Sequence, residues 1–444
     1  MTGTPTDAPV VPGGPPLLGH ALELFHRPLD FLTSLQDHGE VVVFRLGTRP
    51  AYMVTDAEVL KELLITRHST FEKGGGFFES GMELVGNGLA SSNGTFHLRQ
   101  RRMMQQAFHH GRMSGYAQAA LGAADELSDT WREGQVIDLA REFSGLTMRI
   151  LARTLFSDLD PEKAAEICRC MPLLVDGVAR RAFLPVDFVH RLPLPVNRRE
   201  AAAMRSLHRT VDGIIADYRA SSLDQNDLLS ALMLARDEHT GEGMGTQHIH
   251  DEIRTMMLAG TETSATTLHW AFALMSAHPD VEERVHAELA EVLGGDPVHH
   301  SDLPRLEYLG RVVQEILRMY PTGWLLTRRT TVGTSLGGYR IPAGADVFFS
   351  PYAIHHDPPF FPSPERFDPD RWLPERARHI PRHAYLPFGA GVRKCIGESL
   401  AYRETTLVLA TLAGRWRLRS LTGLPPRTTL RPKEKRMRLE RHTR

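Results

Sequence analysis

Cysteine is scarce in this chain of 444 residues, which contains Cys168, Cys170 and Cys395 and no others. Three cysteines cannot form the disulfide framework of a small secreted protein. Cys168 and Cys170 also lack the second pair of ligands that a structural zinc site requires. We interpret these two as packing residues in a reducing compartment such as the cytoplasm. The role of Cys395 needs a separate explanation.

The chain also lacks an excess of charge of either sign, and it lacks a long apolar run. Its 52 Lys and Arg balance 53 Asp and Glu, so nothing in the composition favours a nucleic-acid partner. No segment offers the roughly 18 uncharged apolar residues of a membrane span. The N-terminus has no basic start followed by a cleavable apolar run. We therefore expect a cytoplasmic protein that binds a small molecule or another protein, with no membrane contact.

The pattern of elements predicts one domain spanning all 444 residues, because neither an internal repeat nor a long linker divides the chain. Helical periodicity dominates from about residue 57 to 318 and again from 398 to 413. Short β-rich runs and turns gather at residues 39–56 and 321–350. The fold class is therefore mainly α, a large helical domain with a small β-rich lobe. The first 12 residues, rich in proline and glycine, are expected to lack fixed structure.

Cys395 lies in FGAGVRKCIG, among glycines and cations, which is a setting for chemistry rather than for packing. Gly391 and Gly397 permit backbone conformations closed to other residues and allow a flat ligand to approach. The residues that follow have helical spacing, so Cys395 precedes a helix N-terminus. The N–H groups there, with Arg393 and Lys394, are expected to lower the pKa of the thiol. The thiolate is then a nucleophile or a metal ligand. The segment holds no histidine base, and a haem iron fits best.

Phe388, Gly391, Arg393, Cys395 and Gly397 form the pattern FxxGxRxCxG. The pattern resembles the haem-binding signature of the cytochrome P-450 monooxygenases, and the resemblance extends over nearly the whole chain. It implies the cytochrome P-450 fold and haem b with Cys395 as the axial ligand of the iron. It also implies a reaction that inserts one oxygen atom of O2 into a C–H or C=C bond. Electrons would come from NAD(P)H through a ferredoxin and its reductase, and the protein would be a monomer.

The segment MMLAGTETSATTLHWAF, residues 256–272, has a glycine and five hydroxyl residues inside a helical pattern, which are poor choices for helix stability alone. Such hydroxyls bond to carbonyls four residues back and loosen the turn. Alone, the segment also fits an ordinary buried helix. It resembles the oxygen-activation motif of the family. That resemblance implies that Ala259 and Gly260 leave space for O2 over the iron, and that Glu262 and Thr263 are the acid–alcohol pair that delivers protons.

Glu315 and Arg318 in QEILRMYP are three residues apart and share one helix face, so they can form an ion pair. A lone ExxR is usually a solvated surface pair. Together with PERF at residues 364–367, it resembles the buried Glu–Arg–Arg triad of the family, whose third member would be Arg366. The implied role is structural, because the triad would fix the cysteine loop beneath the haem.

A haem carries two propionates, which need cationic partners. His97 and Arg101 are four residues apart on one predicted helix face and resemble the propionate clamp of the family. By the same resemblance, Arg329 precedes the GGYRIPAG turn as a third partner, and Arg393 completes the set.

Arg99, Arg102 and Lys394 are predicted to lie on the cysteine side of the haem and to face solvent. Together they would form a positive patch on which an acidic electron-transfer protein could dock.

The predicted substrate cavity is apolar, which favours a compact hydrocarbon over a charged substrate. Each candidate side chain also fits an ordinary core position. The segments WLLTRRTT and FDPDRWLPERA resemble the actinobacterial branch of the family that oxidises sesquiterpenes and related terpenoids in secondary metabolism, so a terpenoid is the expected substrate. The candidate cavity residues are Phe77, Phe78, Met82, Val85, Met257, Leu258, Thr322, Trp324 and Leu325.

Several alternatives stay open. A macrolide, polyketide or fatty acid would be the substrate in other branches of the family. A peroxide-using haem–thiolate enzyme would share the cysteine but normally lacks the acid–alcohol pair. A non-catalytic haem-binding protein would need neither that pair nor an apolar cavity. A terpene cyclase would need an acidic metal cluster such as DDxxD, and the sequence contains none.

Overall fold

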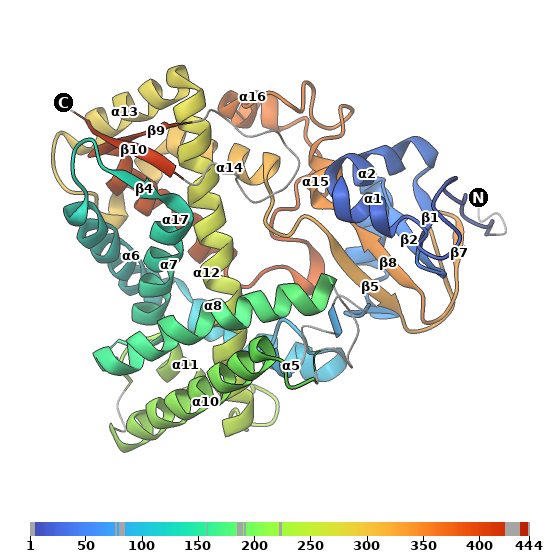
Figure 1. Ribbon diagram of the computed structural model, residues 1–444, viewed down its shortest axis with the longest axis horizontal. Coiled ribbons are helices and arrows are strands. Elements are labelled where there is room, and N and C mark those ends of the chain that lie inside the picture. Colours follow the sequence, from blue (N-terminus) through green and yellow to red (C-terminus); the bar gives the residue numbers. More distant parts are fainter. Residues whose placement is uncertain are drawn as a thin grey trace.

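The structure, a computed structural model, has a large helical part and a smaller β-rich lobe (Figure 1). None of the helices in the part of the chain that it describes is long and apolar enough to cross a membrane. The described residues are 5–75, 78–79, 85–157, 159–183, 190, 192–221, 224–421 and 436–442.

Helices form most of the molecule, as the periodicity predicts. The mainly α fold class is therefore confirmed. The α-helices are α1 (Ala21–His26), α2 (Pro28–Ser34), α3 (Ala57–Lys61), α5 (Gly94–Gln105), α6 (His110–Thr130), α7 (Leu139–Leu155), α8 (Pro161–Phe183), α10 (Pro195–Ser221), α11 (Leu228–Leu234), α12 (Thr246–Ala277), α13 (Pro279–Leu293), α14 (Glu307–Met319), α15 (Pro351–His355), α16 (Pro374–Ala377) and α17 (Glu398–Ala413). Shorter helical turns are η1 (Leu35–His38), η2 (Glu62–Thr66), η3 (His68–Thr70), η4 (Gln106–Phe108), η5 (His300–Arg305), η6 (Pro369–Trp372) and η7 (Gly391–Arg393).

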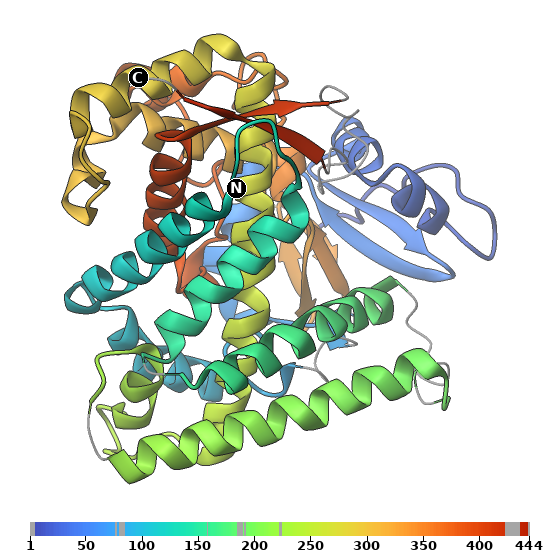
Figure 2. The same cartoon turned by 60° about the vertical axis from the view of Figure 1, so that its left-hand side comes forward.

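Helix α12 organises the helical part. Its 32 residues make it about 48 Å long, and it runs through the middle of the surrounding helices (Figures 1 and 2). Its C-terminal half is buried against α6, α7, α13, α14 and α17, where one continuous apolar core forms. Within that core, Trp270 of α12 stacks on Tyr320 with ring centroids 3.5 Å apart. The predicted oxygen-activation motif therefore lies on a helix that is packed against neighbouring helices along most of its length.

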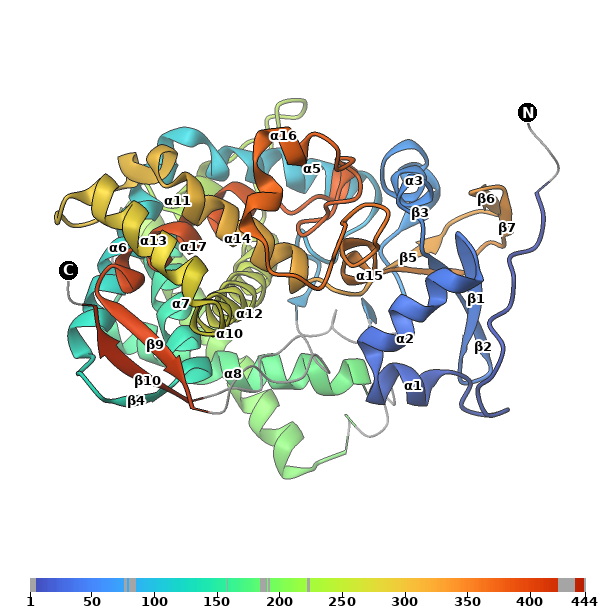
Figure 3. The ribbon, with the colours of Figure 1, turned by 90° about the horizontal axis from the view of Figure 1, so that it is seen from above.

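Three sheets accompany the helices, and the view from above separates the β-rich lobe from the helical part (Figure 3). The main sheet has the strand order β1-β2-β8-β5-β3, with β1 and β2 forming the predicted hairpin. Two small sheets have the orders β4-β10-β9 and β6-β7. The strands are β1 (Val41–Leu46), β2 (Arg49–Val54), β3 (Phe71–Glu72), β4 (Val136–Asp138), β5 (Leu326–Thr330), β6 (Thr334–Leu336), β7 (Tyr339–Ile341), β8 (Asp346–Phe349), β9 (Trp416–Ser420) and β10 (Arg436–Arg441).

The N-terminal segment is ordered from residue 5, so the prediction of a first dozen residues without fixed structure is wrong for residues 5–12. The Val11 N–H donates to the Val43 carbonyl at 2.8 Å, and the Thr6 N–H donates to the Gly338 carbonyl at 3.1 Å. The Val11 side chain is buried. Residues 5–12 are ordered because they form hydrogen bonds with backbone groups at the sheet edges and cover apolar surface.

Glu315 of α14 is the centre of a buried charge network. Its carboxylate is fully buried and accepts two hydrogen bonds from Arg318, both at 2.9 Å. The Trp372 indole N–H also donates to it at 2.9 Å. The predicted Glu315–Arg318 pair is therefore part of the core and not a solvated surface pair.

The third member of this network is Arg371, and the prediction of Arg366 is wrong. Arg371 is buried and its Nε donates to Glu315 at 3.3 Å. The Arg366 side chain is exposed, and the residue contributes its backbone carbonyl as an acceptor for Arg318 at 3.4 Å. The chain contains Pro–acid–Arg–aromatic twice, five residues apart, as PERF and as PDRW at 369–372. The second copy supplies the buried arginine.

The network reaches the cysteine loop through α15. Arg318 donates to the His355 carbonyl at 2.8 Å, and His355 Nδ1 lies 3.0 Å from the Arg318 carbonyl. On its other side, His355 Nε2 accepts the Leu386 N–H at 2.8 Å, two residues before Phe388. Between residues 362 and 386 the chain has two short helical segments, η6 and α16, and is otherwise irregular, so these buried side chains stabilise its position.

We predict that Arg371→Ala greatly reduces the yield of folded protein, whereas Arg366→Ala does not. Removing one partner of a buried ion pair leaves an uncompensated charge and costs about 3–5 kcal/mol. Arg366 is exposed and its backbone contact survives the substitution. Thermal unfolding of the two purified variants, with Glu315→Ala as a positive control, measures the difference. Equal unfolding temperatures for Arg371→Ala and Arg366→Ala would contradict this assignment.

Candidate active site

The loop that carries Cys395 depends on glycine at one position in particular. Gly391 has a φ of +69°, and a Cβ there would lie 2.0 Å from the Leu64 carbonyl oxygen. A side chain would therefore displace η2. The Cys395 N–H donates to the Phe388 carbonyl at 2.9 Å, which closes the loop, and α17 begins three residues later. The predicted position of Cys395, just before a helix, is confirmed.

The pKa of the Cys395 thiol is raised in the protein alone, so the prediction of a lowered pKa is wrong. Solvent reaches the thiol, but protein encloses it on its other sides, and this desolvation is the main cause. The Gly397 N–H, Arg101 and Lys394 act in the opposite direction and are outweighed, while the nearby Glu398 adds to the rise. A bound metal cation reverses this balance, because a coordinating thiol is deprotonated outright.

Ala259 and Thr263 are exposed in the middle of α12, although most of that helix is buried. They are four residues apart and share one face, and the Thr263 hydroxyl donates to the Ala259 carbonyl at 2.6 Å. The Thr261 and Thr267 hydroxyls make equivalent bonds at 2.8 and 2.9 Å. The motif therefore forms the predicted bonds to carbonyls four residues back, and it presents a hydroxyl to an open space.

Gly260 has a different role from the one predicted. A Cβ on Gly260 would lie 3.2 Å from Leu151 of α7, so the missing side chain faces the neighbouring helix. The glycine allows α7 and α12 to pack closely. Of the two small residues in the motif, Ala259 is the one exposed to the open space.

A hydrogen bond ties this part of α12 to the helix that follows Cys395. Glu404 of α17 bonds to Ser264, the residue after Thr263. Burial raises the pKa of the Glu404 carboxyl to about 7, and the bond to Ser264 opposes the rise. The open face of α12 and the cysteine loop are thereby fixed in relation to one another.

Four cationic side chains, each half-buried, interact in one region: Lys73, Arg101, Arg328 and Arg393. Their hydrogen bonds within the described residues go to backbone carbonyls. Arg101 donates to the Lys394 carbonyl at 2.6 Å, and Arg393 donates to the Ser92 carbonyl at 3.1 Å. Burial lowers the pKa of Arg328 to about 10, with Arg393 adding to the shift. Cations held at neutral carbonyls, with their charges only partly balanced, form a site for an anionic ligand.

Arg329 is not part of this region, which corrects its prediction as a propionate partner. Its Nε donates to Asp346 at 2.9 Å, and it also pairs with Glu79. Arg328 and Arg329 are neighbours on β5, so their side chains point to opposite faces of the sheet. Arg328 takes the place predicted for Arg329.

His97 lies beside the cations and is neutral. Its pKa is lowered to about 3, mainly by desolvation and then by Lys73 and Arg393. The ring is buried, and its Nδ1 lies 3.3 Å from the Ser92 hydroxyl. His97 is therefore suited to donate a hydrogen bond to an anion without adding charge, while Arg101 supplies the charge.

The predicted positive patch is largely neutralised. Arg99 pairs with Glu242 at 2.9 Å and with Asp237 at 3.5 Å, and Arg102 pairs with Asp237 at 3.0 Å. Lys394 pairs with Glu398 at 2.5 Å. These residues do not present a block of unbalanced positive charge, because acidic side chains from the turn before α12 and from α17 reach them.

The predicted cavity residues are found in several environments. Val85 and Met257 are buried, and Met257 belongs to the apolar core of α8, α10, α11 and α12 with Leu258 at its edge. Phe78 and Thr322 are half-buried. Trp324 and Leu325 pack against the core of the β-rich lobe. Phe77 and Met82 lie outside the described residues, and a cavity role for the whole set stays a prediction.

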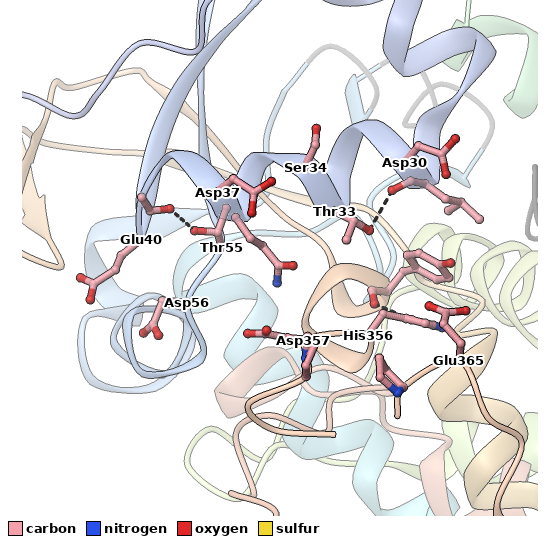
Figure 4. Close-up of a pocket in the computed structure, with 16 residues that line it drawn as sticks. Asp30, Thr33, Ser34, Asp37, Glu40, Thr55, Asp56, His356, Asp357 and Glu365 are labelled. Atoms are coloured by element: carbon pink, nitrogen blue, oxygen red, sulfur yellow. Dashed lines mark hydrogen bonds between the residues drawn. The ribbon is translucent and has the colours of Figure 1, made fainter. Parts of the chain in front are cut away.

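A separate cleft of about 940 Å³ opens between α2, η1 and the chain after α15 (Figure 4). It does not suit an anionic cofactor, because carboxylates line it and no Lys or Arg does. The charge of the two regions therefore favours the site beside Cys395 over this cleft. The acidic lining residues are Asp30, Asp37, Glu40, Asp56, Asp357 and Glu365.

Comparison with known families identifies the chain. The family model described as cytochrome P-450 matches residues 9–440. The chain belongs to the cytochrome P-450 family. It is a monooxygenase that carries haem with a cysteine thiolate ligand and uses O2 with reducing equivalents from a redox partner.

Three similar proteins from Streptomyces cover almost the whole chain. The chain is 46% identical to cyclooctatin synthase of S. melanosporofaciens, over 96% of this chain and 92% of that protein. It is 43% identical to cyclooctat-9-en-7-ol 5-monooxygenase of the same species, over 93% and 90%. It is 41% identical to pentalenene oxygenase of S. avermitilis, over 93% and 91%.

The residues of this chain fit a haem. The two propionates of a haem would balance the positive charge of Lys73, Arg101, Arg328 and Arg393, and the exposed Cys395 lies in a loop that a flat ligand can approach. Sequence reasoning missed Lys73 and Arg328. The alternation of side chains along β5 would have raised Arg328 as a candidate, whereas nothing local to Lys73 distinguishes it from a surface lysine.

We predict that Arg328→Gln weakens haem retention, whereas Arg329→Gln leaves it unchanged. Losing a charge-assisted bond to a propionate costs about 1.5–3 kcal/mol, which corresponds to about tenfold or more in the rate of haem loss. Transfer of haem to an excess of a scavenging globin measures the rate. A faster loss of haem from Arg329→Gln than from Arg328→Gln would show that Arg329 is the propionate partner, as the sequence predicted.

Proposed function

We propose that this chain is a terpenoid monooxygenase in which Cys395 is the axial ligand of the haem iron. The observation that carries the proposal is the cluster of half-buried cations next to the exposed Cys395, with which Arg101 interacts. The exposed Ala259–Thr263 face of α12 supports it. The names of the relatives support the substrate class, since they include a pentalenene oxygenase and a cyclooctat-9-en-7-ol monooxygenase.

When bound, the haem supplies the iron that activates oxygen, and a thiolate ligand donates electron density that favours O–O cleavage. Cys395 would hold the iron, and Arg101, Arg328, Arg393 and Lys73 would hold the propionates, with His97 as a neutral donor. Ala259 would leave room for the haem and a small ligand because its side chain is a single methyl group. The apolar residues around Leu258 exclude water from the substrate side.

Thr263 is the residue placed to hold a proton at the reacting oxygen. Its Oγ1 donates to the Ala259 carbonyl, and the same hydroxyl is free to rotate toward a ligand in the open space. Glu262 is the adjacent acid. Consecutive helix residues point about 100° apart, so Glu262 supplies Thr263 through water rather than by direct contact. This acid–alcohol pair favours an O2-dependent monooxygenase over a peroxide-using enzyme.

Electrons from NAD(P)H reach the haem through a ferredoxin and its reductase, and the enzyme acts as a monomer. The substrate is a cyclic terpenoid hydrocarbon or alcohol. Such a ligand gains about 25 cal/mol for each Å² of apolar surface that leaves water, and the apolar cavity residues leave few of its groups unpaired. A macrolide, polyketide or fatty acid is the alternative substrate.

Optical titration with a panel of cyclic terpenes tests the function. We expect a shift of the Soret band toward the high-spin position with at least one terpene, because the ligand displaces water from the iron.

The reduced wild-type protein with carbon monoxide is expected to absorb in the far Soret region of thiolate-ligated haem, and Cys395→His to lose that band. Retention of the band in Cys395→His would exclude Cys395 as the ligand. Tight binding of fatty acids or macrolides, with no shift from any terpene, would refute the substrate class.

We predict that Thr263→Ala keeps haem and substrate binding but diverts reducing equivalents into hydrogen peroxide. Positioned proton transfer contributes about 10²–10⁴-fold, so product formed per NAD(P)H consumed should fall at least about tenfold. Thr261→Ala is the matched control, because it removes a hydroxyl bonded four residues back on a buried face of the same helix. Equal coupling in both variants would remove Thr263 from proton delivery.

A further inference from the structure

Residues 85–93, here called the cavity loop, lie in unusually close contact with the N-terminal half of α12. A Cβ on Gly88 would lie 2.1 Å from the Thr255 hydroxyl and 2.7 Å from the Asp251 carbonyl oxygen. A Cβ on Gly86, whose φ is +74°, would lie 2.4 Å from Asp251 Oδ1. Two glycines thus let the backbone of the loop reach the helix surface.

Two adjacent buried carboxylates of α12 hold the loop by its backbone. The Asn87 N–H donates to Asp251 at 3.0 Å, and the Leu89 N–H donates to Glu252 at 2.9 Å. Asp251 has further partners in Arg254 and Gln247. Glu252 is fully buried, and its second oxygen has no hydrogen-bond partner among the described residues. The one hydrogen bond that the Glu252 carboxylate makes among these residues is therefore the bond to the loop.

Lys73 holds the same residue from the other side. Its Nζ donates to the Leu89 carbonyl at 2.6 Å, so both backbone polar groups of Leu89 are bonded to ionisable side chains. The side-chain amide of Asn93 fixes the backbone of Lys73. The Lys73 N–H donates to Asn93 Oδ1, and Asn93 Nδ2 donates to the Lys73 carbonyl, each at 2.9 Å. Lys73 also interacts with Arg393 and Arg328. The cavity loop therefore joins α12 to the cationic side of the haem site.

The loop covers the part of α12 that precedes its exposed residues. Asp251, Thr255, Ala259 and Thr263 follow one another at intervals of four, so they form a row that turns around α12 by about 40° at each step. The loop covers the first two positions, and the last two are exposed. Leu89 belongs to the same apolar cluster as Met256 and Met257. A displacement of the loop would therefore move Leu89 within this cluster.

We propose that Glu252 is a positioning residue for substrate selection, which fixes the cavity loop against α12 by accepting the Leu89 N–H. The proposal rests on the proposed function, because it concerns the same cavity and the same class of substrate. The hydrogen bond of the Glu252 carboxylate goes to the loop, and its electrostatic interactions are with Asp251 and with Lys73 of the cationic region. It acts through Leu89, whose position sets the width of the cavity.

An acceptor, and not a charge, is what this role requires. Burial raises the pKa of the Glu252 carboxyl to about 7, with Asp251 adding to the rise, while the Leu89 N–H and Lys73 oppose it. The carboxyl keeps an oxygen that accepts the Leu89 N–H whether or not it is protonated. Glutamine offers the same acceptor at the same reach, so Glu252→Gln is the conservative replacement, whereas Glu252→Ala removes the acceptor.

Hydrogen–deuterium exchange of the haem-loaded enzyme without substrate tests the anchoring. We expect the amides of the cavity loop to exchange about tenfold faster in Glu252→Ala than in the wild type, and at the wild-type rate in Glu252→Gln. Gly88→Ala displaces the loop without altering any charge and should give the same acceleration. Gly115→Ala is its control, because a Cβ there meets nothing within 4 Å.

Terpene titrations of the same proteins test selection. Glu252→Ala and Gly88→Ala should change the order of dissociation constants across the panel, with the ligand that binds best to the wild type weakened about tenfold. Glu252→Gln should restore the order. Unchanged loop exchange in both Glu252→Ala and Gly88→Ala would overturn the proposal, and so would faster exchange with the order preserved. If no terpene shifts the wild-type spectrum, the proposed substrate class fails. The order is then read from whichever apolar ligands do shift it.

Discussion

The burial of the Glu315 carboxylate is the constraint on which the rest of the site depends. A charge with no exposed surface is tolerated only when hydrogen bonds satisfy it, and here Arg318, Arg371 and Trp372 supply them. These partners come from α14 and from the proline-rich chain after α15. The carboxylate thus fixes the position of η6, and His355 links the same network to Leu386 and the cysteine loop.

The fold and the centre of the site were predictable because both are local in the sequence. Helical periodicity gave α17 its observed bounds, Glu398–Ala413. The spacing of Cys395, Gly391 and Phe388 fixes a loop whose geometry is closed by a hydrogen bond within the same ten residues. The hydroxyls of α12 also found their acceptors within one turn. In each case the information lies within a short window of the chain.

The wrong predictions concern properties that depend on residues distant in the sequence. Arg366 and Arg371 stand in similar local sequences, and only the position of Glu315, more than fifty residues earlier, distinguishes them. Arg328 and Arg329 differ by a single step along β5, and pairing with β8 decides which one faces the haem region. The pKa of Cys395 depends on how many protein atoms enclose it, which no local pattern of glycines and cations reveals. Burial and register are properties of the tertiary fold.

The cations around Arg328 and Arg393 have a consequence for how the protein is made. Held close together and partly shielded from solvent, they repel one another until a dianionic group binds, so the protein without its cofactor carries a cost that the loaded enzyme does not. A ligand that binds the folded chain and relieves such repulsion shifts the folding equilibrium by mass action. Haem binding then stabilises the folded chain as well as serving catalysis. The supply of haem in the cell therefore affects how much of this chain reaches its native state.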